Sequence, residues 1–295
     1  MHRFIAVTIL ALSVSGLTLS AEDLSLPSMS KGDPGAGMRV RLTAPEYVGS
    51  GVYHSLYLPA DWSTASVEGG ETWPVIVEYT GNYFPAAGST GEVKDAGLGY
   101  GISRGKFIWV VLPFIEPDRS KNAITWWGDE TLTANYAKAN IPRICEEYGG
   151  DPDKVILCGF SRGAIAVNYI GLHDDEIAKL WCGFITHDHY DGVKEWGGTH
   201  WGTPLETYQA AATKRLDRIR DRPVLVCRNG STAATETFLK GRVALKNFTF
   251  LSINTGNILG DFPNRWAIHP HNDRWLLKAS EEANAVARWV DAITK

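Results

Sequence analysis

The sequence predicts an α/β domain with a mostly parallel sheet, helices on both faces of that sheet and an antiparallel hairpin at its N-terminal end. The main observation is a series of short, continuous apolar runs, which are typical of parallel strands buried on both sides. These runs cover 74–77, 107–112, 155–158, 180–185, 223–227 and 248–253. Segments with helical spacing of apolar residues lie between the runs, and such alternation indicates a doubly wound arrangement.

The hairpin and the helices have their own signals. Apolar and polar residues alternate in 40–42 and 52–58 on either side of the turn residues 49–51, which predicts the hairpin. Apolar residues recur at helical spacing over 132–148 and predict a long helix. Ser280 is followed by two glutamates, and this pair of features predicts the start of the last helix, because serine caps helix N-termini and acidic residues suit the first turn.

Length and composition predict a single domain behind an export signal. The chain has 295 residues, 44% of them hydrophobic, which is enough for one large core, and we assign this domain to 38–295. Residues 1–21 are predicted to be a signal peptide, so the protein is expected to be secreted or periplasmic. Their apolar stretch is short and interrupted by Thr8 and Ser13, which argues against a membrane anchor. The polar segment 22–37 is predicted to be a mobile linker.

The charge of the chain and the positions of its cysteines and histidines bear on nucleic-acid binding, disulfides and metal sites. The formal net charge is −4 and the 29 Lys and Arg residues are spread along the chain, so a nucleic-acid partner is not expected. Cys158, Cys182 and Cys227 lie in predicted central strands, where disulfide geometry is rare, and free thiols are therefore expected. A bridge that involves Cys145 is the alternative. No Cys or His spacing indicates a metal, and we expect no cofactor.

The segment Gly159-Phe160-Ser161-Arg162-Gly163 is the strongest functional motif. It follows the apolar run 155–158 and precedes the helical segment 164–170, so this G-x-S-x-G sequence has the strand-turn-helix context that gives the motif its meaning. In such a turn the glycines allow the strand and the helix to approach closely. The motif therefore predicts that the Ser161 hydroxyl is exposed at the end of a sheet as a nucleophile.

With this motif, the alternating strands and helices and a late histidine, the chain resembles the α/β-hydrolase superfamily, and within it secreted serine esterases and polyester-depolymerase-like proteins. The resemblance covers 40–295. It implies a histidine base after the last strand, where His269 and His271 occur. We favour His271, because it is nearer to the last helix and Pro270 fixes the backbone before it. His269 is the alternative.

The acid that would orient this histidine is less evident. In the superfamily it usually follows the strand that corresponds to 223–227, but the next residues, 228–235, contain no carboxylate. A less common arrangement places the acid after the preceding strand, where the loop contains two aspartates. We favour Asp188, with Glu236 second and Asp191 third.

The resemblance also implies two backbone N–H donors for an oxyanion. Arg162 would supply one. Asn82 would supply the other, because Tyr79-Thr80-Gly81-Asn82 resembles the His-Gly-x turn of the family with threonine in place of histidine. The residues Trp126, Trp127, Trp196, His200 and Trp201 lie in predicted loops, where they could bind a sugar or an aromatic group or pack as a small satellite core.

These observations predict a secreted serine hydrolase that cleaves carboxylic esters, on carbohydrate-linked or polymeric substrates, through an acyl-enzyme. The alternatives are a non-catalytic binding protein on the same fold, which the ambiguous acid favours, and a serine peptidase. The expected partner is a small-molecule or polymeric ester, without stable membrane insertion.

Overall fold

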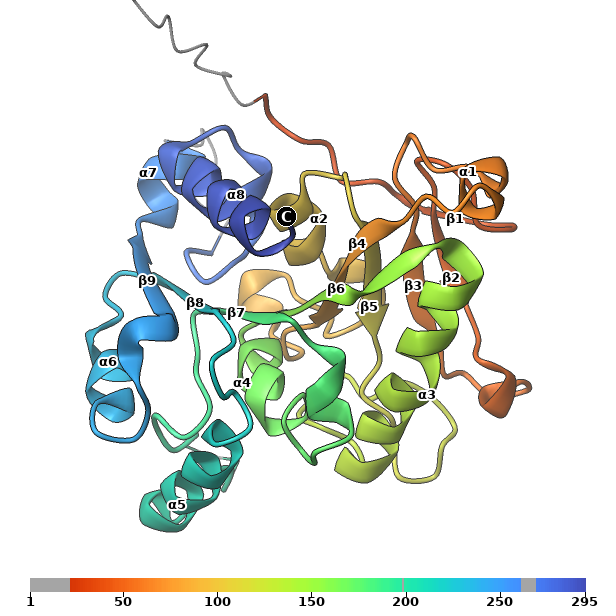
Figure 1. Cartoon of the computed structure of the whole chain (residues 1–295). Coiled ribbons are helices and arrows are strands. Elements are labelled where there is room, and N and C mark those ends of the chain that lie inside the picture. Colours follow the sequence, from red (N-terminus) through yellow and green to blue (C-terminus); the bar gives the residue numbers. More distant parts are fainter. Residues whose placement is uncertain (1–21, 198, 261–268) are drawn as a thin grey trace, which may run out of the picture.

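The centre of the molecule is a twisted, mostly parallel sheet (Figure 1). The structure is a computed structural model that describes residues 22–197, 199–260 and 269–295. The predicted signal peptide 1–21 lies outside the described residues. Within them, no helix is long and apolar enough to cross a bilayer. The described part of the sheet has nine strands: β1 Met29–Ser30, β2 Arg39–Leu42, β3 His54–Tyr57, β4 Trp73–Tyr79, β5 Ile108–Leu112, β6 Gly150–Phe160, β7 Gly183–His187, β8 Val224–Asn229 and β9 Phe248–Ile253.

The order of the strands confirms the predicted sheet and hairpin. The strands lie in the order β1-β2-β3-β5-β4-β6-β7-β8-β9. Strand β2 pairs antiparallel with β3, with Leu42 opposite His54, and β3 pairs antiparallel with β5. From β5 to β9 all neighbouring strands are parallel, so their carboxyl ends meet at one edge of the sheet. Within the segment 22–37, predicted to be a linker, β1 pairs parallel with β2.

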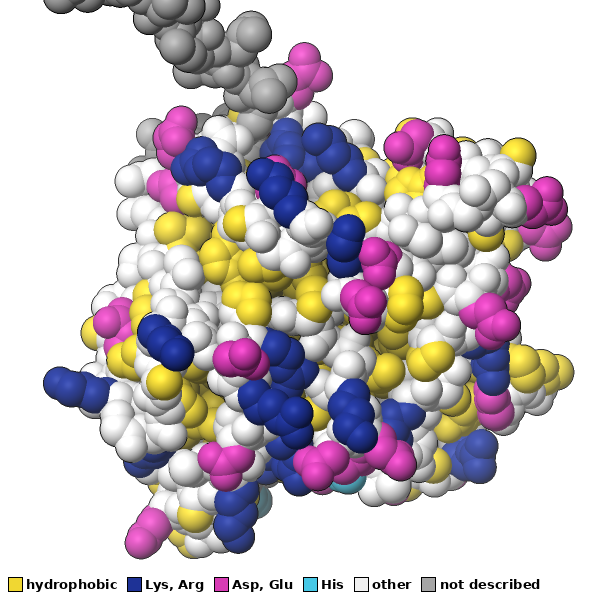
Figure 2. All heavy atoms as spheres, in the orientation of Figure 1, with side chains coloured by type: hydrophobic (Ala, Val, Ile, Leu, Met, Phe, Trp, Pro, Cys, Tyr) yellow, Lys and Arg dark blue, Asp and Glu magenta, His cyan; other side chains and the backbone are white. Residues whose placement is uncertain are grey.

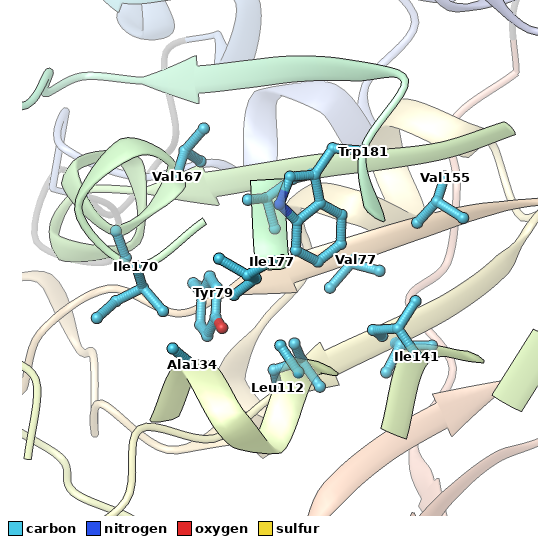
Figure 3. Packing of buried hydrophobic residues seen from close by; sticks show 14 of the residues in the cluster. Val77, Tyr79, Leu112, Ala134, Ile141, Val155, Val167, Ile170, Ile177 and Trp181 are labelled. Atoms are coloured by element: carbon cyan, nitrogen blue, oxygen red, sulfur yellow. The ribbon is translucent and has the colours of Figure 1, made fainter. Parts of the chain in front are cut away.

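Helices cover both faces of this sheet, as predicted. One face packs against α3, α4, α5 and α6, and Figure 3 shows part of this core, a single cluster that joins Val77 and Leu112 of the sheet with Ile141 and Val167 of the helices. The other face packs against α2 and α8. Alternate residues of a strand point to opposite faces, which is why fully apolar strands are needed here. The α-helices are α1 Thr64–Glu68, α2 Leu98–Ser103, α3 Glu130–Tyr148, α4 Arg162–Tyr169, α5 Leu205–Leu216, α6 Ala233–Leu239, α7 Thr255–Leu259 and α8 Glu281–Ile293.

The strand predicted at 180–185 is displaced toward the C-terminus. Residues 177–180 form a 3-10 turn, and β7 begins only at Gly183. The indole of Trp181 is buried in the helical layer, where its Nε1 donates to the Gly171 carbonyl over 2.8 Å, so this residue leaves the line of the sheet. Cys182 therefore precedes the strand instead of lying within it, and β7 extends to His187.

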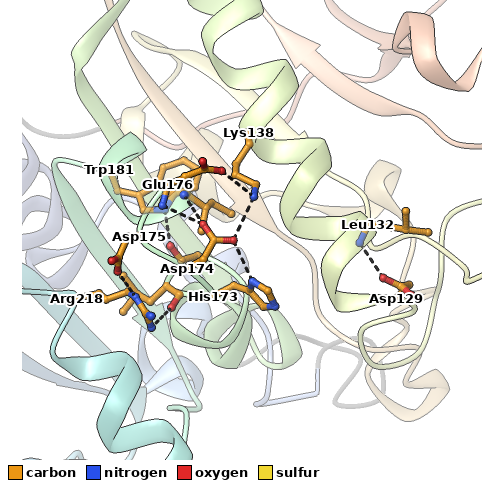
Figure 4. Close-up of polar contacts among 12 residues, drawn as sticks. Asp129, Leu132, Lys138, His173, Asp174, Asp175, Glu176, Trp181 and Arg218 are labelled. Atoms are coloured by element: carbon orange, nitrogen blue, oxygen red, sulfur yellow. Dashed lines mark hydrogen bonds and ion pairs between the residues drawn. The ribbon is translucent and has the colours of Figure 1, made fainter.

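Ion pairs join the turn after α4 to its neighbouring helices (Figure 4). Lys138 of α3 lies 3.2 Å from Asp174 and 3.3 Å from Glu176, and Arg218, just beyond α5, lies 2.6 Å from Asp175. Such partly exposed pairs each contribute at most about 1 kcal/mol. On the face seen in Figure 2, acidic and basic side chains lie interspersed, in agreement with this pattern of local pairs.

Candidate active site

Ser161 lies at the sharp turn between β6 and α4. Its φ and ψ are 57° and −119°, a combination that is strained for any residue with a side chain. A Cβ at Gly159 would lie 2.1 Å from the Gly163 carbonyl oxygen, and a Cβ at Gly163 would lie 1.8 Å from the Tyr79 carbonyl oxygen. Both flanking positions therefore require glycine. The turn directs the Ser161 side chain away from the sheet at the carboxyl end of β6.

Three sequence-predicted side chains are hydrogen-bonded in a row. His271 Nε2 lies 2.8 Å from Ser161 Oγ, and His271 Nδ1 lies 2.7 Å from Asp188 Oδ2. The serine follows β6, the aspartate follows β7, and the histidine precedes the last helix, so the carboxyl edge of the parallel sheet brings together residues more than a hundred positions apart. Chemically, the row allows an imidazole to accept the serine proton while a carboxylate holds the opposite ring nitrogen.

The backbone around Asp188 holds its carboxylate in place. Asp188 has a φ of 74°, and its backbone N–H donates to the Cys227 carbonyl over 2.9 Å. The Asn229 N–H donates to Asp188 Oδ1 over 2.8 Å, which leaves Oδ2 for His271. Burial alone would raise the pKa of Asp188, but the adjacent His187 ring, the His271 hydrogen bond and the Asn229 N–H together lower it well below its ordinary value. The carboxylate is therefore ionised at neutral pH.

The alternative residues have other contacts. His269 Nδ1 accepts the backbone N–H of His271 over 3.1 Å, so His269 supports the loop of the histidine that contacts Ser161. Asp191 forms a buried bidentate pair with Arg215, at 2.7 and 3.0 Å. Glu236 lies within α6, where it accepts a hydrogen bond from the Thr232 hydroxyl over 2.5 Å.

The two predicted oxyanion donors line the same cavity as Ser161. Gly81 lies against the nucleophile turn, since a Cβ at this position would be 3.5 Å from the Ser161 Cβ, and this close approach brings the loop of Asn82 to the cavity in front of Ser161. The side chain of Asn82 is fixed, because its Oδ1 accepts the Trp126 N–H over 2.7 Å. Arg162 is the first residue of α4, where helical N–H groups have no partner within the helix.

The side chain of Arg162 has a role that the sequence did not indicate. It is 1% exposed, and its guanidinium donates to the carbonyls of Trp126 over 2.6 Å and Gly81 over 2.9 Å and to the Thr80 hydroxyl over 3.1 Å. It also lies 4.0 Å above the Phe114 ring. No carboxylate among the described residues pairs with it. The guanidinium therefore joins the Asn82 loop and the Trp126 loop to the nucleophile turn.

His187, also buried, adds a second imidazole beside Asp188. The indole N–H of Trp275 donates to its Nε2 over 2.9 Å. The same Nε2 lies 3.1 Å from the Asn272 carbonyl oxygen, so it has a donor and an acceptor beside it. His187 Nδ1 lies 3.6 Å from Asp188 Oδ1, the oxygen that does not contact His271. The position of His187 directly before Asp188 could have drawn attention to it, but the orientation of the His187 ring depends on the distant Trp275.

A cavity of about 430 Å³ opens in front of Ser161. Trp126 and Trp196 line it with ring centroids 5.8 Å apart, and exposed Tyr83 and Phe84 contribute further aromatic surface. The predicted aromatic group thus divides into two parts. Trp127 is buried in the main core, Trp201 packs against it at 5.0 Å, and His200 does not line the cavity.

No group of three His, Cys, Asp or Glu side chains in the described ranges is arranged to hold a metal ion. All four cysteines are free thiols, Cys145 included.

Comparison with known proteins supports the fold. No family model and no curated protein matches the chain. Among solved structures, a ferulic acid esterase matches with a TM-score of 0.51 at 13% identity, over 87% of this chain and 96% of its own. An esterase structure from Rhizomucor miehei matches with a TM-score of 0.55 at 11% identity, over 86% of this chain and 80% of its own. A sugar hydrolase from Lactococcus lactis matches with a TM-score of 0.52 at 13% identity, over 87% and 95%. The chain has the α/β-hydrolase fold.

Proposed function

We propose that the protein is a serine esterase that cleaves carboxylic esters through an acyl-enzyme. The main support is the row of contacts from Ser161 Oγ to His271 at 2.8 Å and from His271 to Asp188 at 2.7 Å, at a strained turn that faces a cavity. Strain of this kind costs stability and is concentrated at functional sites. A non-catalytic binding protein would leave both the strain and the contacts without a role.

In the proposed reaction, His271 Nε2 accepts the Ser161 proton as Oγ attacks the ester carbonyl. The N–H groups of Asn82 and Arg162 stabilise the negative charge on the tetrahedral oxygen. Ionised Asp188 holds the His271 ring and stabilises its positive charge. The alcohol leaves with the proton from His271, and a water molecule, activated by the same ring, releases the acid from Ser161.

The cavity suggests esters with a ring or a sugar next to the cleaved bond. Trp126, Trp196 and the half-exposed Tyr83 and Phe84 provide flat apolar surfaces of the type that stack on such groups. We therefore retain carbohydrate-linked or polymeric esters as the proposed substrates. Such substrates agree with the proposed export of the protein by residues 1–21.

Hydrolysis of p-nitrophenyl acetate and butyrate by the mature chain tests this function. Wild-type protein should release p-nitrophenol and bind a fluorophosphonate at Ser161, and Ser161→Ala should lose several orders of magnitude in kcat. Ser66→Ala, in α1 and outside the cavity, is the matched control and should retain full activity. Equal activity in Ser161→Ala and wild type would rule out the proposed mechanism.

A further inference from the structure

The wall of the cavity contains an exposed lysine beside an aromatic ring. Lys194 lines the cavity, and its ammonium lies 4.2 Å from the centre of the Trp196 ring. This cation–π contact holds the charge at the cavity wall instead of in bulk solvent. None of the described residues that line the cavity is acidic. The side of the cavity formed by Lys194 is therefore positively charged.

A second cation, Arg228, lies beside the loop that carries the cavity residue His189, because the backbone groups on either side of it, at Cys227 and Asn229, are hydrogen-bonded to Asp188. Arg228 is the penultimate residue of β8, and strand alternation places its side chain on the same face as Val224 and Val226. Burial and, after it, repulsion from Arg228 lower the pKa of Lys194. Burial, then His271 and the same two cations, lower the pKa of the cavity residue His189 to about 3. The His189 ring is therefore uncharged at neutral pH, under the influence of the positive charges of Lys194 and Arg228.

The nearby carboxylates do not neutralise this pair. Asp188 contacts His271, and Asp191 is paired with Arg215 over 2.7 Å. Glu195, the residue after Lys194, accepts the Leu205 N–H over 2.9 Å. Among the described residues, neither Lys194 nor Arg228 has a carboxylate within ion-pairing distance. Two cations without a paired carboxylate repel each other, and an anion bound at this end of the cavity would relieve that repulsion.

We propose that Lys194 and Arg228 select esters that carry a carboxylate in addition to the ester group. This inference rests on the proposed esterase function and adds a substrate class to it. The aromatic walls would stack on the ring or sugar of the substrate, and the two cations would pair with its carboxylate. The neutral His189 would supply one further hydrogen bond.

Two pairs of aryl esters test the charge preference. In the first pair, 4-acetoxybenzoate and 4-acetoxybenzamide differ in the charge of the alcohol part. In the second, mono-p-nitrophenyl terephthalate and its terephthalamate differ in the charge of the acyl part. The readout is the ratio of kcat/KM for the charged and the neutral member, so that a general loss of activity in a variant cancels.

We expect wild-type protein to prefer the carboxylate in at least one pair by roughly tenfold at low salt, a scale set by two partly screened ion pairs. Lys194→Gln and Arg228→Gln should each reduce the ratio, Lys194→Glu should bring it below one, and salt should lower it in wild type. Lys214→Gln, on α5, removes one positive charge outside the cavity and should leave the ratio unchanged.

Ratios near one in both pairs, or ratios that do not respond to Lys194 and Arg228, would overturn the inference while leaving the esterase function intact. If no ester is turned over, the proposed function fails, and the charge preference is measured separately. Calorimetric titration of wild-type protein with 4-acetoxybenzoate and 4-acetoxybenzamide then decides it, with equal affinities counting against the two cations.

Discussion

Two residues of the site have backbone conformations that side chains rarely adopt. Ser161 and Asp188 have φ values of 57° and 74°, and each lies immediately after a strand of the parallel sheet. Each conformation costs of order 1–3 kcal/mol, and hydrogen bonds to the neighbouring strand offset this cost. The Ser161 N–H donates to the His187 carbonyl over 3.0 Å, and the Asp188 N–H donates to Cys227 over 2.9 Å. The sheet thus fixes both residues relative to each other.

The two late histidines should differ sharply when they are replaced. His271→Ala removes the ring that contacts Ser161, and we expect kcat to fall nearly as far as in Ser161→Ala. His269→Ala removes an acceptor for the His271 N–H and an edge contact with Phe84 at the cavity but leaves the His271 ring in place, so a loss of roughly tenfold or less is expected. Steady-state kinetics on p-nitrophenyl butyrate measures both. The reverse order of effects would assign the base to His269.

Replacement of the acid should affect turnover far more than binding. In Asp188→Asn the ring of His271 loses the partner that fixes its orientation and tautomer, so kcat should fall by roughly a thousandfold or more with little change in KM. Asp191→Asn is the matched control, because it changes the aspartate three positions away, which pairs with Arg215. It should lower the free energy of unfolding while the activity per folded molecule is retained. An active Asp188→Asn variant would contradict the assignment.

The sequence reveals a site residue only where its role imposes a local pattern on the neighbouring residues. Ser161 is recognisable because its chemistry requires glycines at fixed local positions. The acid has no such local signature, and residues 228–235 merely exclude the usual position. The contacts of Arg162 and His187 are with segments that are distant along the chain, at Gly81 and Trp275, so no local pattern could reveal them.

At the scale of elements, the hydrogen bonds of a buried arginine, in addition to packing, hold the nucleophile turn against two loops. The Arg162 guanidinium reaches the loop after β4, at Thr80 and Gly81, and the loop before α3, at Trp126. One loop carries the proposed oxyanion donor Asn82 and the other carries a wall of the cavity. The position of one loop relative to Ser161 is thus coupled to the position of the other.

Arg162→Lys should therefore reduce turnover without abolishing substrate binding. A lysine side chain cannot reach all three acceptors, and carbonyls left without a donor are costly when buried. We expect kcat to fall by roughly tenfold or more with a smaller change in KM, since small displacements of catalytic groups have large effects. Titration with a fluorophosphonate counts the folded sites. Unchanged kcat per titrated site would show that the guanidinium does not position the oxyanion loop.

The displaced strand β7 illustrates the limit of element prediction. The apolar run at 180–185 was predicted correctly as a strand, but its first residues pack against helices because the Trp181 indole finds an acceptor at Gly171. Apolar character alone does not distinguish burial in the helical layer from burial in the sheet. The shift matters for function, since it places His187 at the strand end and Asp188 directly beyond it.

At the scale of the whole molecule, a buried carboxyl group joins the sheet to the helix on its second face. Glu78 of β4 is 1% exposed, and its oxygens accept the N–H groups of Leu98 and Gly99 at the start of α2 over 3.3 and 2.8 Å. The Trp109 indole of β5 donates to it over 2.9 Å. Burial, followed by the negative charge of Asp273, raises the pKa of Glu78 from 4.5 to about 7.

This raised pKa gives the stability of the fold a pH dependence. The folded protein binds the Glu78 proton more tightly than the unfolded chain does, so the contribution of Glu78 is fully present below pH 4.5 and is lost as pH rises toward about 7. His54 acts in the opposite direction, because burial lowers its pKa from 6.5 to about 4 and its contribution is lost as pH falls through that range. Other groups with shifted pKa values add to the wild-type curve, among them Asp273, whose pKa burial raises, and His189, whose pKa burial lowers to about 3.

Glu78→Gln isolates the contribution of the carboxyl group, since glutamine stays neutral at every pH. Its free energy of unfolding, measured by denaturant titration from pH 4 to pH 8, should rise relative to that of wild type as pH increases. Even if the amide weakens the contact with Trp109 and lowers stability throughout, the slope of the difference keeps its sign. Glu71→Gln, an exposed glutamate two residues before β4, is the matched control and should give a flat difference. If the difference in free energy of unfolding between Glu78→Gln and wild type also does not change with pH, the three N–H donors keep the buried carboxylate ionised and its pKa is not raised.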